Sequence, residues 1–173
     1  QARGAAQGGR LTTANKAKAG AAGIVLASLA LMATIRQDEG REYQPYLDIV
    51  GVPTVCDGIT GPDVVPGKIY TDADCNRLTI KNLEKHGTQL LDCISVRVTQ
   101  GMYEALASWA YNVGAGAACK STALRLINAG NYAAGCRDLM RWNRAGGKVV
   151  RGLTLRRERE SQKCLANIPK AAS

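Results

Sequence analysis

Two carboxylic acids and a hydroxyl lie close together in the first third of the sequence. Glu39 precedes a glycine, Asp48 follows in the next stretch, and Thr54 comes shortly after it. Cleavage of a glycosidic bond needs a protonated carboxyl at the leaving oxygen and a second group that activates water or stabilises positive charge. A Glu at a helix end and an Asp in a turn are more often simply two solvated acids. The spacing alone therefore leaves both interpretations open.

The elements around these residues are expected to place them across a cleft. An apolar stretch runs up to Glu39, and Gly40 is a natural helix stop. Residues 43–60 carry β-branched residues punctuated by Gly and Pro, which predicts a small antiparallel hairpin or three-stranded sheet. The acid would thus end a helix, and its partner would lie in the sheet.

The rest of the chain is predicted to be helical. Thr71 and Asp74 resemble a capping box that opens a helix to about residue 92. Thr99 is expected to cap a helix that ends at the glycine-rich turn 112–116. Further helices are predicted over about 119–128, 131–142 and 153–166. Only 43–60 is expected to be strand, so the predicted fold class is α+β, with a small antiparallel β-subdomain and a larger helical lobe.

Charge and size narrow the function without fixing it. The chain has 173 residues and a formal net charge of +9, which suits one basic domain with its own core. Five of the basic residues lie in residues 1–36, which contain no acid, so the remainder is only mildly basic. Such a surface suits an anionic polymer, whether nucleic acid, a membrane surface or cell wall.

Cysteine usage indicates an oxidising compartment. The sequence contains six cysteines without a CxxC pair and one histidine, so a zinc site is hard to assemble. The even number and wide spread favour three disulfides. We favour the pairs Cys56–Cys75, Cys93–Cys119 and Cys136–Cys164, although the sequence leaves other pairings open.

The segment between Lys18 and Arg36 indicates export. Its 17 residues are uncharged, yet only seven of them are large and apolar. As a helix they would span roughly 26 Å, slightly less than the ~30 Å hydrocarbon core of a bilayer. No convincing cleavage site follows. Three interpretations stay open: a permanent anchor, an uncleaved export signal that later leaves the bilayer, and a buried first helix.

A series of motifs resembles the phage-type lysozymes. Around the candidate acids these are Glu39-Gly40, Pro45-Tyr-x-Asp48 and Gly51-x-x-Thr54-x-x-x-Gly58. Further along come Tyr-Thr-x-x-x-Cys (70–75), Tyr-Asn-Val-Gly-Ala-Gly (111–116), Arg-Trp-Asn-Arg-Ala-Gly-Gly (141–147) and Gly-Leu-x-x-Arg-Arg-x-x-Glu (152–160). The resemblance covers about residues 37–166 in the family's order.

This resemblance implies a lysozyme-like fold and a role for each candidate residue. Glu39 would be the general acid, Asp48 its carboxylate partner and Thr54 the hydroxyl that positions water. The implied protein is a phage endolysin, a muramidase that hydrolyses the β-1,4 bond between N-acetylmuramic acid and N-acetylglucosamine in peptidoglycan. We expect no cofactor, no metal and no nucleic-acid partner, and a monomer.

The apolar segment also resembles the signal-arrest-release segments of some endolysins. That resemblance implies a flexible basic N-terminus (1–18), a signal-arrest-release helix (19–36) and a catalytic domain (37–173). The enzyme would be exported to the host periplasm, tethered to the inner membrane through residues 19–35 and then released. After release we expect residues 19–35 to pack as a helix on the helical lobe and to help set Glu39 in position.

Several residues keep two interpretations. Asp57 departs from the family's pattern, and an extra carboxylate there could be mistaken for the catalytic one. Trp109 and Trp142 could stack on sugars but more often belong to a core. A cluster of basic residues could line a cleft or form a solvated face; its members are Arg141, Arg144, Lys148, Arg151, Arg156 and Arg157.

Two alternative functions stay open for the protein as a whole: a lytic transglycosylase, and a non-catalytic, membrane-tethered wall-binding protein.

Overall fold

The first described helix ends at the candidate acid. The computed structural model describes residues 23–48 and 51–170. Helix α2 (Leu29–Glu39) begins at Ser28, whose hydroxyl accepts a hydrogen bond from the Leu31 amide. It ends at Gly40, which adopts a φ of +72°. A side chain would be strained in that conformation, so the predicted glycine stop is confirmed.

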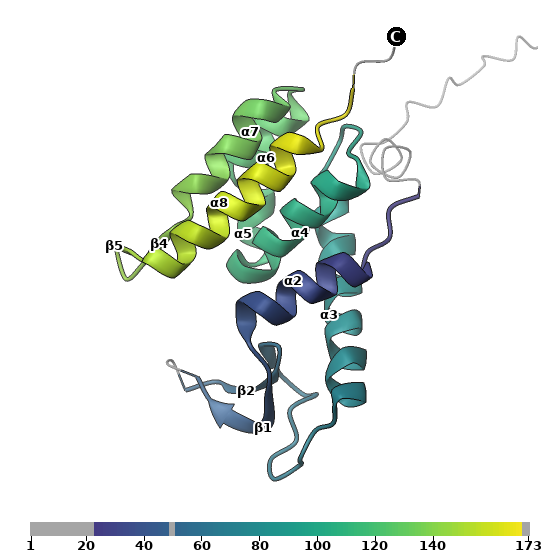
Figure 1. Cartoon of the computed structure of the whole chain (residues 1–173), viewed down its shortest axis with the longest axis vertical. Coiled ribbons are helices and arrows are strands. Elements are labelled where there is room, and N and C mark those ends of the chain that lie inside the picture. The colour runs from purple at the N-terminus through teal and green to yellow at the C-terminus, as the bar shows by residue number, and fades with distance from the viewer. Residues whose placement is uncertain (1–22, 49–50, 171–173) are drawn as a thin grey trace, which may run out of the picture.

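The region 43–60 forms the predicted antiparallel sheet. Strands β1 (Glu42–Leu47), β2 (Pro53–Cys56) and β3 (Ile59–Thr60) pair in sequence order. Tyr46 lies opposite Thr54, and Thr54 lies opposite Thr60, so Thr54 occupies the middle of the sheet. Figure 1 shows this sheet at the end of α2, with helix α3 (Asp72–Asp92) running from it into the helical lobe.

The helical lobe is built around helix α4 (Gln100–Val113), whose apolar side chains fill the main core. The remaining elements are α5 (Ala115–Cys119), α6 (Thr122–Asn128), α7 (Tyr132–Asp138), the 3₁₀ helix η1 (Leu139–Arg141) and α8 (Arg151–Ala166). Thr71 and Asp74 form the predicted capping box, and Thr99 caps α4 as predicted. The α+β fold class, with its larger helical lobe, is confirmed.

Two details differ from the sequence prediction. The helix predicted over 119–128 is divided, because Ser121 caps a new helix and accepts a hydrogen bond from the Leu124 amide. A second antiparallel hairpin also exists, formed by β4 (Arg144–Ala145) and β5 (Lys148–Val149). Its turn consists of Gly146 and Gly147, both with positive φ, which is typical of a tight two-residue turn. The prediction that only 43–60 is strand was therefore wrong.

All three favoured disulfides are present. Cys56–Cys75 joins the sheet to the start of α3, and Cys93–Cys119 joins the end of α3 to α5. Cys136–Cys164 joins α7 to α8, with both sulfur-bearing residues fully buried.

The described part of the apolar segment packs on the helical lobe, but only part of it is helical. Leu31 and Ile35 are completely buried against the core, whereas Val25 and Leu29 remain 57% and 86% exposed. Residues 19–22 and the predicted flexible N-terminus (1–18) lie outside the described residues. In the described part of the chain, we found no helix of the length and apolar character that a membrane span requires.

Polar contacts hold residues 25–28 on α4. The side-chain amide of Gln100 both donates to and accepts from the Val25 main chain, at 3.0 and 2.9 Å. The Tyr103 hydroxyl donates to the Leu26 carbonyl at 3.0 Å. The chain is thus fixed immediately before α2 begins.

Candidate active site

Glu39 lies at the last turn of α2 with its carboxylate held from one side. Its Oε1 accepts a 2.6 Å hydrogen bond from Nη1 of Arg156 on α8, and its side chain remains 22% exposed. The other oxygen, Oε2, faces the turn between β2 and β3. A Cβ atom built on Gly58 would lie 3.8 Å from it. Oε1 is therefore held by the ion pair with Arg156, while Oε2 lies beside Gly58, which has no side chain to crowd it.

A buried cluster of charges supports this arrangement. Arg156 is only 5% exposed and also pairs with Glu160 at 3.1 Å and with Asp38 at 3.3 Å. Its Nη2 donates to the Ser108 carbonyl at 3.2 Å. The guanidinium thus joins the end of α2 to α4 and α8 in one network, and the planar group suits such multiple contacts.

The environment keeps Arg156 charged. Burial lowers the pKa of Arg156, but the nearby charges of Glu39, Glu160 and Asp38 outweigh it and raise the pKa overall. Burial raises the pKa of Glu160 and lowers that of Arg157. Arg156 therefore remains positively charged beside Glu39.

Glu39 borders a hollow of about 440 Å³ between the ends of α2 and α4 and the start of α8. Its lining includes Glu39, Asn112, Val150, Leu153 and Arg156. Polar and apolar groups meet there around the carboxylate. Among residues 23–48 and 51–170, no three His, Cys, Asp or Glu side chains gather so as to hold a metal ion.

Asp48 and Thr54 lie together on the hairpin that follows Glu39. Asp48 Oδ1 accepts from the Val52 amide at 2.8 Å, and the Thr54 hydroxyl donates to the Val52 carbonyl at 3.0 Å. Thr54 is only 4% exposed. Because its proton is used by Val52, the Thr54 oxygen has lone pairs left to accept a hydrogen bond. The structure brings these two residues together through Val52, whereas Glu39 is held separately by α8.

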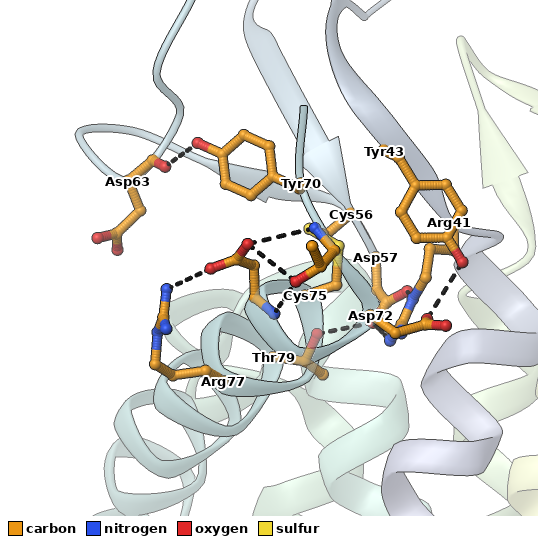
Figure 2. Close-up of a disulfide and its surroundings, with 12 residues drawn as sticks. Arg41, Tyr43, Cys56, Asp57, Asp63, Tyr70, Asp72, Cys75, Arg77 and Thr79 are labelled. Atoms are coloured by element: carbon orange, nitrogen blue, oxygen red, sulfur yellow. Dashed lines mark hydrogen bonds and ion pairs between the residues drawn. A yellow bond between two sulfur atoms is a disulfide. The ribbon is translucent and has the colours of Figure 1, made fainter. Parts of the chain in front are cut away.

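Asp57 is a structural carboxylate within the described fold. It is fully buried, and the Arg41 side chain binds it through Nε at 2.8 Å and Nη2 at 2.6 Å. Figure 2 shows this pair beside the Cys56–Cys75 disulfide, and Arg41 also donates a hydrogen bond to Asp72. The hydrogen bond to Asp57 raises the pKa of Arg41, so Arg41 remains charged.

For Trp109, Arg156 and Arg157 the structure decides between the two interpretations left open by the sequence. Trp109 is fully buried and contacts Trp142 edge to face at 5.5 Å, which is a core arrangement. Arg156 and Arg157 belong to no solvated face, because both are buried. The supporting roles of Arg156, Asp38 and Glu160 were not predicted. For Arg156 and Glu160 the signal was the Arg-Arg-x-x-Glu motif at 156–160.

The chain is similar to known proteins in sequence and in fold. A family model described as phage lysozyme matches residues 36–160. The SAR-endolysin of Enterobacteria phage P21 is 45% identical over 157 residues, which cover 90% of this chain and 95% of that protein. The SAR-endolysin of Bacteriophage PS119 is 48% identical over 127 residues, or 73% of this chain and 76% of that protein.

A solved structure has a similar fold. The endolysin from Escherichia coli O157:H7 phage FAHEc1 superposes with a TM-score of 0.75 at 30% identity. The match covers 86% of this chain and 98% of that one. The similarity therefore extends over most of this chain.

Proposed function

Since this chain belongs to the phage lysozyme family, we propose that it is a muramidase, with Glu39 as its general acid. It is a lysozyme-type peptidoglycan hydrolase of the phage endolysins. The bond that it cleaves is, in our proposal, the β-1,4 bond between N-acetylmuramic acid and N-acetylglucosamine. The observation that carries this assignment is the Glu39 carboxylate, fixed by Arg156 at the border of a hollow.

The two oxygens of Glu39 have different tasks in this proposal. Oε1 is held by Arg156, which fixes the orientation of the carboxyl group. Oε2 would carry the proton and donate it to the leaving glycosidic oxygen. Orientation matters because a proton donor must lie within hydrogen-bond distance of the oxygen that it protonates.

Asp48 and Thr54 would act on the sugar and the water. The Asp48 carboxylate stabilises the positive charge that develops at the anomeric carbon. The Thr54 oxygen, whose own proton bonds to Val52, accepts a hydrogen bond from the attacking water. Asp48→Asn keeps an acceptor for the Val52 amide, so it removes the charge while preserving the turn.

Product analysis tests the reaction. Purified full-length protein is incubated with peptidoglycan, and the released sugars are separated by mass spectrometry. Hydrolysis adds water and leaves a reducing N-acetylmuramic acid, and Asp48→Asn and Thr54→Ala should each slow its release about 100-fold or more. An anhydro sugar would instead establish a lytic transglycosylase. Wall binding without release of sugar would establish a binding protein.

We further propose that residues 19–35 first tether the enzyme to the inner membrane, on the periplasmic side, and then leave the bilayer. The domain boundaries 1–18, 19–36 and 37–173 are part of this proposal. Support comes from the relatives named SAR-endolysin and from the residues that pack on the body. Leu31 and Ile35, which suit lipid, are also fully buried against protein. The same segment could therefore pack either against lipid or against the protein core.

Ala30 and Ala33 allow a clean test of release, because both are exposed on α2. Ala30→Leu/Ala33→Leu adds apolar surface for insertion without entering the core. We expect a larger membrane fraction and later lysis than in the wild type. Ala30→Gln/Ala33→Gln is the matched opposite and should leave the membrane sooner. If both variants fractionate like the wild type, the release mechanism is wrong.

A further inference from the structure

Asp57 is a buried carboxylate that the proposed mechanism does not use. It is 0% exposed, and its oxygens accept two hydrogen bonds from Arg41 and one from the Thr79 hydroxyl at 2.7 Å. Its main-chain carbonyl accepts a fourth from the Tyr111 hydroxyl at 2.8 Å. Burial of a charge is unfavourable unless its partners are well placed, so this arrangement tolerates little displacement.

Arg41 connects this carboxylate to the catalytic acid along the chain. It lies two residues after Glu39, in the link between α2 and β1. Its side chain is only 6% exposed, and its Nη1 also donates to Asp72 at the start of α3 at 2.7 Å. Figure 2 shows Asp57 and Asp72 together at the end of the Arg41 side chain. The backbone that leaves Glu39 is thereby attached to two other elements.

Asp57 also lies in the turn that faces the acid. Cys56 has a φ of +55° and, among the described residues, is the one non-glycine residue with positive φ. Gly58 has a φ of +81° and lies next to Oε2 of Glu39. The Cys56–Cys75 disulfide and the Asp57–Thr79 hydrogen bond both attach this turn to α3. Such an unfavourable backbone persists only when its surroundings hold it.

We propose that Asp57 and Arg41 are positioning residues for Glu39. Arg41 fixes the chain that follows the acid, and Asp57 fixes the turn beside its free oxygen. Arg156 holds the remaining oxygen from the other side. Arg41 lies in the link between α2 and β1, Asp57 in the turn between β2 and β3, and Arg156 on α8, so three separate parts of the chain restrain Glu39. We call the contacts of Arg41 and Asp57 the clamp. A displacement of 1 Å at a catalytic group can reduce turnover about 100-fold, so a clamp that prevents such a displacement would sustain activity. This inference rests on the proposed role of Glu39.

A matched pair of substitutions at Thr79 separates positioning from packing. Thr79 is 1% exposed. Thr79→Val keeps its shape but removes the hydroxyl that binds Asp57, and Thr79→Ser keeps the hydroxyl but removes the methyl group. On soluble peptidoglycan fragments, we expect kcat of Thr79→Val to fall about 3- to 10-fold with an unchanged KM. Thr79→Ser should keep the wild-type kcat. Full kcat in Thr79→Val, or an equal loss in Thr79→Ser, would overturn the proposal.

Asp57→Asn tests the charge itself, with Asp63→Asn as its control. Asp63 pairs with Lys81 at an exposed site, so its substitution should leave kcat unchanged. We expect kcat of folded Asp57→Asn to fall about 10-fold or more, again without a change in KM. Equal activity in the two variants would contradict the clamp. If Asp57→Asn does not fold, the Thr79 pair decides.

The outcomes also separate this inference from the proposed function. An inactive wild-type protein, or an active Glu39→Gln variant, would refute the function itself. An active wild type, an inactive Glu39→Gln and a fully active Thr79→Val would refute only the clamp.

Discussion

Arg156 is the residue on which the site most depends besides the acid. It connects Glu39 to Asp38 and Glu160, whose side chains are 4% and 3% exposed. Removing a cation from such a cluster leaves buried negative charges without their partner, which is more costly than the loss of an exposed pair. Arg156 therefore contributes both to the stability of the fold and to the orientation of the Glu39 carboxylate.

Substitution of Arg156 should affect both properties. We expect Arg156→Gln to lower the free energy of unfolding by about 3–5 kcal/mol and to reduce hydrolysis strongly. Arg156→Lys should restore little, because an ammonium group cannot reproduce the planar contacts. Urea unfolding and hydrolysis rates measure the two effects. Arg77→Gln, at a pair whose arginine is 68% exposed, should stay within about 0.5 kcal/mol of the wild type. A similarly small effect at Arg156 would disprove its central role.

At the residue scale, residues identified by a local motif were predicted, whereas the burial of a residue by partners distant in sequence was not. Glu39, Asp48 and Thr54 were predicted because they lie within one short segment that resembles the phage-type lysozymes. Their catalytic roles remain predictions. Arg156 was placed among basic residues that could line a cleft or form a solvated face, because periodicity gave no sign that a charged residue on α8 would be buried against α2. The partners lie far apart in sequence, so only the fold brings them together.

At the element scale, α4 is the platform for the N-terminal segment. Glu104 on α4 accepts hydrogen bonds from Ser28 at 2.5 Å and Gln100 at 3.0 Å, and it pairs with Lys163 of α8 at 2.7 Å. Ser28 also caps α2. Glu104 therefore joins the start of α2 to α4 and α8.

This network should make docking of the segment pH-dependent. Burial raises the pKa of Glu104, but hydrogen bonds from Lys163, Ser28 and Gln100 outweigh it and lower the pKa below its ordinary value of 4.5. A carboxyl group with a lowered pKa stabilises the fold above its ordinary value, and this stabilisation is lost as pH falls through the lowered pKa. Glu104→Gln should therefore be less stable than the wild type at pH 7, and the difference should narrow at about pH 3. Urea unfolding at both pH values checks this. A difference that stays constant would exclude Glu104 as the titrating group.

Element boundaries followed local signals where those signals were strong. Gly40, the Thr71 capping box and Thr99 gave the limits of α2, α3 and α4. The β4–β5 hairpin was missed because each strand has only two residues, too few for a visible alternation. The apolar segment of 19–35 gave no sign that the described helix would begin only at Leu29.

At the scale of the whole molecule, the disulfides connect successive parts of the fold. Cys136–Cys164 closes a loop of 28 residues and holds α7 against α8, the helix that carries Arg156. The number and spread of the cysteines were enough to predict three disulfides. The favoured pairs each join elements that the predicted α+β fold could bring together. The fold was therefore more predictable than the polar contacts inside it.

Removal of this bridge should destabilise the protein without changing the chemistry. In the chain-entropy model, Cys136→Ala/Cys164→Ala lowers the free energy of unfolding by about 3.5 kcal/mol. Below its melting temperature, the variant should retain its kcat. Denaturant unfolding and a thiol titration of the denatured wild type provide the check. Six reactive thiols in that titration, or an unchanged stability, would contradict the disulfide assignment.

The central claim is that Glu39 supplies the proton that cleaves the glycan. Glu39→Gln keeps the size of the side chain and can still accept a hydrogen bond from Arg156, but its amide is no proton donor at the leaving oxygen. The decisive measurement is the rate at which purified Glu39→Gln protein, shown to be folded by circular dichroism, releases reducing N-acetylmuramic acid from peptidoglycan. We predict a loss of about 1,000-fold or more relative to the wild type. Release near the wild-type rate from a folded variant would contradict the account.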